Sequence, residues 1–153
     1  MKRFWFLFAF LLAAPPAGAE QACTEIGCLD GLTLDVASDH RWPAGKYSFN
    51  FRLDGRAVNC TGALPLKPCG EPGIVCDGPG VMITESGCAL PAAAHGFGPV
   101  MLPGGPQKLQ VAVSHNGRLL TEKSLTPQYR ESRPNGPQCE PLCRQASAAL
   151  FAE

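Results

Sequence analysis

Apolar and polar residues alternate in several short stretches of the chain, and an alternation with a period of two predicts half-buried β-strands. The clearest stretch is residues 46–53 (KYSFNFRL), where every second residue from Tyr47 onward is apolar. Residues 31–37 and 109–113 alternate in the same way with aliphatic side chains. Weaker patterns predict further strands at residues 56–64, 81–84, 99–102 and 118–125, the third at a sheet edge because it begins with proline.

Two dipeptides predict tight hairpin turns between these strands. Asp54-Gly55 directly follows residues 46–53, and Asn116-Gly117 directly precedes residues 118–125. Both dipeptides favour two-residue turns, because such turns place their central residues at positive φ. Trp42 precedes the aromatic strand and is expected to cover one end of the core.

These patterns predict an all-β fold of about six or seven short strands. Helical patterns do not alternate with the strands, which argues against a parallel α/β sheet. We therefore expect a disulfide-stapled antiparallel β-sandwich of the immunoglobulin-like type, with a small β-barrel as the alternative. The alanine-rich residues 142–151 (LCRQASAALF) predict one short C-terminal helix.

The first 19 residues have the organisation of an export signal. Lys2 and Arg3 precede an uncharged apolar run of 11 residues, which is shorter than the roughly 20 that a membrane-spanning helix needs. Two prolines and the small residues Ala17-Gly18-Ala19 follow. We predict cleavage after Ala19 and a periplasmic or secreted protein whose mature chain has no transmembrane segment.

Eight cysteines follow this cleavage site, and an even number in an exported chain predicts four disulfides. They are Cys23, Cys28, Cys60, Cys69, Cys76, Cys88, Cys139 and Cys143. Their spacing favours pairing within the middle group, as Cys60 with Cys69 and Cys76 with Cys88. The terminal pairs would then bridge locally or tie the two chain ends to the body of the domain.

Two cysteine spacings also suit metal ions. Cys23-x4-Cys28 has the spacing of one zinc knuckle, but no second knuckle follows, and a disulfide sulfur does not bind zinc. Cys139-x3-Cys143 is similar over five residues to the copper-binding motif of Sco-type assembly proteins, and soft thiolates suit Cu(I). We expect no metal and no other cofactor, with copper or thiol-redox chemistry at Cys139 and Cys143 as the alternative.

Composition argues against several function classes. The 13 basic residues balance the 13 acidic ones and form no block of like charge, which argues against a nucleic-acid partner. The 17 glycines and 15 prolines argue against a helical bundle. The chain has only three histidines, His40, His95 and His115, and no HExxH, GxSxG or Walker motif. We therefore predict no catalytic residues and no enzyme activity.

Two long loops are the candidate binding surface. Residues 65–80 and 85–98 are rich in proline, glycine and cysteine. Rigid loops on a sandwich lose little entropy on binding, so they present a surface well. The alternative is that they only cover the edges of the sheets.

The predicted organisation has four parts. They are the signal peptide (1–19), a cysteine-containing lead-in (20–30), the β-sandwich domain (31–126) and a proline-rich tail with Cys139, Cys143 and the short helix (127–153). We expect a binding or structural module whose partner is an unknown protein or envelope component. The alternatives are a copper or thiol-redox chaperone using Cys139 and Cys143, and an inhibitor of an extracellular hydrolase.

Overall fold

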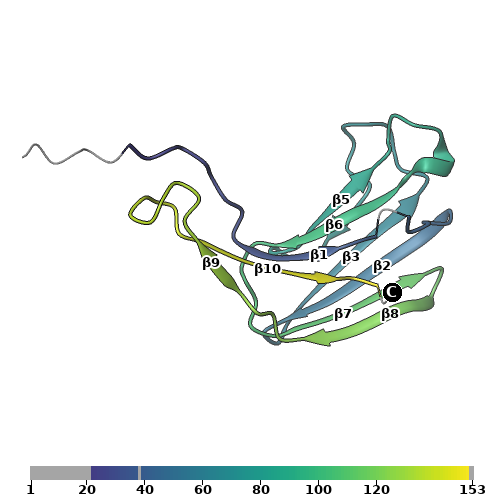
Figure 1. Cartoon of the computed structure of the whole chain (residues 1–153). Coiled ribbons are helices and arrows are strands. Elements are labelled where there is room, and N and C mark those ends of the chain that lie inside the picture. Colours follow the sequence, from purple (N-terminus) through teal and green to yellow (C-terminus); the bar gives the residue numbers. More distant parts are fainter. Residues whose placement is uncertain (1–21, 38, 152–153) are drawn as a thin grey trace, which may run out of the picture.

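The computed structural model describes residues 22–37 and 39–151, and the predicted export signal lies outside this part of the chain. Ten strands and one short 3-10 helix follow one another along these residues (Figure 1). They are β1 (Gly31–Asp35), β2 (Gly45–Leu53), β3 (Arg56–Leu64), β4 (Val75–Cys76), β5 (Met82–Ser86), η1 (Ala92–Ala94), β6 (Gly96–Leu102), β7 (Leu109–His115), β8 (Arg118–Leu125), β9 (Arg130–Ser132) and β10 (Cys143–Ala149). No helix in the described residues has the length and apolarity to cross a membrane.

The strands form two five-stranded sheets. The order is β5-β6-β1-β10-β9 in the first sheet and β4-β3-β2-β7-β8 in the second. Neighbouring strands are antiparallel except β1 and β10, which run parallel. The predicted β-sandwich is confirmed, and the described strands form no closed barrel. The narrower immunoglobulin-like assignment stays a prediction, because it rests on strand number and turn spacing alone.

The core lies between the two sheets, and the apolar residues of the alternating stretches fill it. Every second residue of β2 from Tyr47 to Leu53 is buried. Phe97 of the first sheet meets Phe49 edge-on, with ring centroids 5.4 Å apart. Trp42 lies edge-on to Tyr47 and Phe97 at 5.3 and 5.0 Å and packs against the core, as predicted from its place before the aromatic strand.

Both predicted hairpins are confirmed. Asp54 and Asn116 have φ of 49°, and the glycines that follow them have φ of 92° and 80°. Positive φ at both central residues is what a two-residue turn between twisted strands requires. The Asn116 side chain also accepts a hydrogen bond from the Lys46 backbone at 2.9 Å, so the tip of the second hairpin is attached to the start of β2.

The predicted C-terminal helix is wrong, because residues 143–149 form strand β10. This strand pairs with the whole of β1 and with β9, so the sandwich continues beyond residue 126, where the sequence placed its end. Ala146 and Ala148 pack against the core. A helix of about ten residues gains little on its own. As a strand, the segment completes the hydrogen bonds of β1 and covers apolar surface.

Strand β6 also differs from its prediction, because it begins at Gly96 and lies inside the sheet, between β5 and β1. The pairing of β5 with β6 shifts register between Ile83 and Glu85, opposite Pro99. Proline has no backbone N–H, and an irregularity of this kind is where an internal strand tolerates it. The short strands β4 and β9 have no counterpart among the predicted strands.

Candidate binding surfaces

The three histidines lie in separate places, and each has its own neighbours. His40 stacks on Phe151 with ring centroids 4.0 Å apart, and His115 stacks on Tyr47 at 4.6 Å. His95 lies in the loop after η1. Within the described residues, no hydrogen bond or ring contact joins two histidines.

The adjacent pair Asp39 and His40 lies at the edge of the aromatic cluster. Burial lowers the pKa of His40, and the charge of Asp39 opposes this shift. The imidazole also lies edge-on to Trp42 at 4.6 Å. Its contacts are therefore those of a residue that packs over one end of the core.

The structure joins all eight cysteines in four disulfides, but the predicted partners are wrong. The pairs are Cys23–Cys139, Cys28–Cys143, Cys60–Cys76 and Cys69–Cys88. The middle group does pair within itself, as expected, although with exchanged partners. The terminal disulfides join the two ends of the chain to each other and are not local. Cys28–Cys143 also ties the lead-in to the body of the sandwich, as one of the two expectations had it, because Cys143 is the first residue of β10.

The terminal disulfides hold an extension that projects beyond the sheets, which we call the stapled termini (residues 22–30 and 133–142; Figure 1). Asn135 lies buried between the two segments. Its Oδ1 accepts hydrogen bonds from Thr24 Oγ1 at 2.6 Å and Ile26 N at 2.8 Å. Its Nδ2 donates to the carbonyl oxygens of Ile26 at 3.0 Å and Glu140 at 2.6 Å. One side chain therefore connects both segments.

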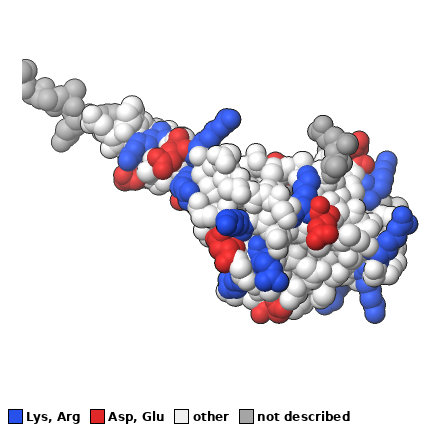
Figure 2. Space-filling view, turned by 90° about the horizontal axis from the view of Figure 1, so that it is seen from below, with Lys and Arg blue, Asp and Glu red and all other residues white. Residues whose placement is uncertain are grey.

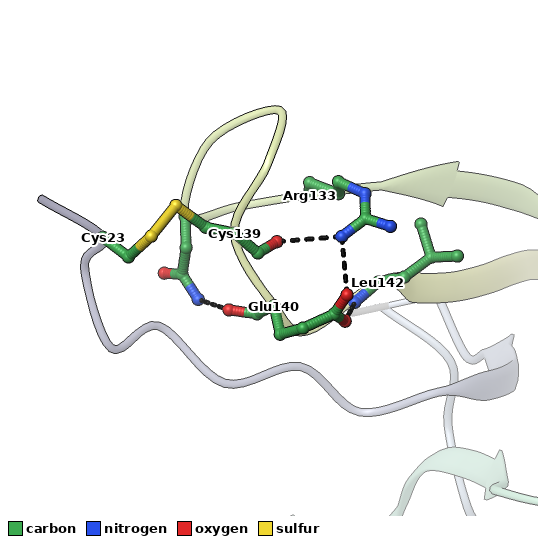
Figure 3. A network of polar contacts seen from close by, with 6 residues as sticks. Cys23, Arg133, Cys139, Glu140 and Leu142 are labelled. Carbon is green, nitrogen blue, oxygen red and sulfur yellow. Dashed lines mark hydrogen bonds and ion pairs between the residues drawn. A yellow bond between two sulfur atoms is a disulfide. The ribbon is translucent and has the colours of Figure 1, made fainter. Parts of the chain in front are cut away.

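A second polar contact fixes the turn beside Cys139 (Figure 3). Arg133 Nη1 donates to Glu140 Oε1 at 2.8 Å and to the Cys139 carbonyl at 3.1 Å. The other oxygen of Glu140 accepts from Leu142 N at 2.9 Å. The hydrogen bond from Arg133, with that from Leu142, lowers the pKa of the Glu140 carboxyl. The carboxylate is therefore the form that this turn stabilises.

The two long loops form one unit, which we call the clamped loops (residues 65–74 and 87–95). Cys69 of the first loop is bonded to Cys88 of the second. Cys60 and Cys76 are directly opposite in the register of β3 and β4, and their disulfide closes the base of the first loop. The first loop belongs to one sheet and the second to the other, so the clamped loops also close one side of the sandwich.

Two side chains reinforce the clamp. Glu85 Oε1 accepts hydrogen bonds from the backbone N–H groups of Gly73 and Ile74, both at 2.7 Å. His95 Nδ1 accepts from Leu66 N at 2.9 Å, and its Nε2 lies 2.9 Å from the Leu90 carbonyl. The contacts of Glu85 and the bond from Leu66 join the first loop to segments distant in sequence, and the contact with Leu90 lies within the second loop, so the pair of loops is held at several points.

Exposed apolar residues flank this rigid unit. Leu90 in the second loop is 58% exposed, and Val75 directly after the first loop is 64% exposed. A shallow hollow of about 420 Å³ lies beside Val75, lined also by Lys46, Thr61 and Gly73. Elsewhere, on the face shown in Figure 2, acidic and basic side chains are interspersed without an area of one sign.

The structure does not provide the thiol pair that the copper alternative needs. Cys139 and Cys143 each bond to a cysteine of the lead-in. Cys28, Asp30 and Cys143 lie within 4.8 Å of one another, but two of these three residues are the partners of one disulfide. A disulfide sulfur is not a thiolate ligand.

No protein-family model, no curated protein and no solved structure matches this chain. The all-β architecture with four disulfides is consistent with an extracellular structural or binding module. Four disulfides also indicate an oxidising compartment, outside the cell or in the periplasm.

Proposed function

We propose that the protein is an exported, non-catalytic binding module that contacts a protein partner through the clamped loops. The observation that carries this proposal is the Cys69–Cys88 disulfide, which locks two loops together beside the exposed side chains of Leu90 and Val75. Ordering loops on binding costs entropy, and loops that are already fixed avoid most of that cost. Apolar side chains on a rigid support are the usual centre of a protein–protein contact.

The inhibitor function is the second candidate, and the geometry around Leu90 favours it. Residues 88–95 are held at one end by the disulfide of Cys88 and at the other by the two hydrogen bonds of His95. A loop fixed at both ends can enter the cleft of a hydrolase without being cut, because it does not adapt to the cleaved geometry. It is a special case of the same binding surface.

Site-specific photo-cross-linking in the exporting host tests the proposal. A photoreactive amino acid replaces Leu90 or Val75, and the matched control replaces Leu119, which is 52% exposed on β8. We expect the same discrete adduct from both test positions and none from the control, and Leu90→Asp should remove the adduct formed at position 75. Adducts from the control alone, or none from either test position, would contradict the proposal.

A further inference from the structure

The two long sides of the sandwich are closed very differently. The side between β4 and β5 carries the clamped loops and their disulfides. On the opposite side lie β8 and the β9–β10 pair, and the chain crosses from β8 to β9 near the lower edge of Figure 1. Lys123 of β8 spans this side, donating to the carbonyl oxygens of Ala149 at 2.6 Å and Phe151 at 3.4 Å.

Strand β10 has an uncovered edge on that side. β9 pairs only with residues 143–145, so residues 146–149 have β1 on one side and no strand on the other. Leu150 N donates to Asp35 O, at the β1 side. Backbone groups alternate along a strand, so those of Ser147 and Ala149 point away from β1. Lys123 donates a hydrogen bond to the Ala149 carbonyl. The N–H and C=O of Ser147 and the N–H of Ala149 therefore remain at the free edge without a strand to pair with.

This edge lacks the protection that other edges carry. β5 carries the acidic Glu85 and pairs with β6 across a register shift, and β8 carries the charged Glu122 and the extra residue of its own register shift with β7. Bulges and charges on edge strands prevent unwanted pairing. Residues 146–149 are Ala-Ser-Ala-Ala, without a charge, a proline or a bulge. Small side chains leave the backbone open to another extended chain.

A groove of about 810 Å³ lies along this edge, and its ends differ in charge. Residues 145–148 line it on one side and residues 125–128 on the other, and residues 31–33 of the neighbouring β1 also line it. The free edge of β10 ends at Arg130, where β9 begins to pair with Gln145, and the groove continues beyond this point to Ser132 and Leu29. Asp35, which is opposite Ala149 in the register, lines it toward the other end. The only ion pair among the described residues is Arg133–Glu140, so Arg130 has no acidic partner there.

We propose that this groove binds the C-terminal residues of an extended peptide, which adds to the free edge of β10 antiparallel and places its carboxylate at Arg130. An antiparallel chain runs in the direction of β9 and must end or turn outward where β9 begins. The guanidinium favours a carboxylate at that point, whereas a parallel chain would place its ammonium group there. Upstream, Asp35 favours a basic residue. The free stretch of four residues spans roughly 13 Å.

A single extended peptide suits this groove better than a second copy of this chain. Residues 125–128 line the groove opposite β10, and β10 of another copy would bring its neighbours β1 and β9 with it, whereas a peptide brings no other strand. Strand addition uses main-chain hydrogen bonds for affinity and side-chain contacts for specificity, which suits the small side chains of residues 146–149 beside the charged Arg130. The surface lies across the sandwich from the clamped loops, so a test of peptide binding here is independent of a test of the proposed function.

Fluorescence anisotropy with a defined peptide tests the inference. The probe is fluorescein-Gly-Lys-Val-Thr-Val-Thr with a free carboxylate, in which Val and Thr favour the extended form and Lys can reach Asp35. We expect a Kd on the order of 100 µM and about fivefold weaker binding of the C-terminal amide. Arg130→Gln should abolish the difference between acid and amide, and the matched control Arg118→Gln, at the tip of the β7–β8 hairpin, should retain it.

Amide resonances locate the peptide and exclude other occupants. We expect the largest shifts in 1H–15N spectra at Ser147 and Ala149, and loss of binding in Ser147→Pro, which removes an N–H that β1 does not use. Unchanged thermal unfolding of this variant shows that the fold is intact. The inference is overturned by no binding at 2 mM peptide, by equal binding of acid and amide, by shifts confined to other strands, or by a protein that dimerises through β10.

Discussion

Removing the two terminal disulfides, singly and together, tests how the stapled termini stabilise the protein. The change is Cys to Ala at Cys23 and Cys139, at Cys28 and Cys143, or at all four positions. Each bridge alone closes a loop with a sequence separation of 116 or 115. When one bridge is present, the other closes only the short ring through residues 23–28 and 139–143, which has about 11 residues.

The expected losses follow from the entropy of closing these rings. Restricting the unfolded chain contributes about 4.8 kcal/mol for the long loop and about 2.8 kcal/mol for the ring of 11 residues. Each single-bridge removal should therefore cost about 2.8 kcal/mol, and removal of both about 7.6 kcal/mol. The double variant thus loses about 2 kcal/mol more than the sum of the two single losses.

Urea unfolding followed by the fluorescence of Trp42 measures these values. Small cavities left by the lost sulfur atoms affect the single and the double variants alike, so they largely cancel in the cycle. If the double variant is unfolded without urea, sulfate, which stabilises folded proteins, can be added at the same concentration to all samples. Two results would refute the reasoning. One is a loss of unfolding free energy of about 5 kcal/mol in each single-bridge variant with the same loss in the double variant. The other is a double loss equal to the sum of the single losses, since nested rings allow neither result.

Three further changes test other contacts. Asn135→Ala removes a buried side chain with four hydrogen bonds and should cost about 2–4 kcal/mol in urea unfolding, whereas a loss below 1 kcal/mol would mean that water replaces it. Glu85→Ala frees the Gly73 and Ile74 N–H groups and should speed proteolytic cleavage within residues 65–74. Glu85→Gln should speed this cleavage less. Equal cleavage rates of the two variants and the unchanged protein would contradict the role of Glu85 in holding the loop. The pKa of Glu140 is lowered on folding, so its stabilisation is present above its ordinary pKa of 4.5 and is lost as the pH falls through the lower folded value. Glu140→Gln should therefore narrow the difference in unfolding midpoint between pH 7 and pH 3, and an unchanged difference would exclude this contribution.

The candidate binding surface was predictable only in part. The richness in proline, glycine and cysteine identified the two loops, but the disulfide that joins them, Cys69–Cys88, was not among the predicted pairs. Glu85, His95 and Asn135 carry no local signal for their roles, because each reaches a backbone group far away in sequence. The free edge of β10 had no signal at all, since the segment was expected to be a helix.

Local patterns determined the strands and hairpins of the central part of the chain. The alternation in β2 and the dipeptides Asp54-Gly55 and Asn116-Gly117 act over a few residues, and their preferences agree with the final fold. The number of disulfides likewise followed from the composition and the predicted export.

The tertiary structure alone decided the disulfide partners and the state of residues 143–149. Cys23 and Cys139 are separated by 116 residues, and they meet because β1 and β10 lie side by side in one sheet. Alanine favours a helix in isolation, but a short segment takes the conformation that its neighbours can hydrogen-bond and cover. Contacts between distant segments depend on how the sheets assemble, and no short stretch of sequence contains that information.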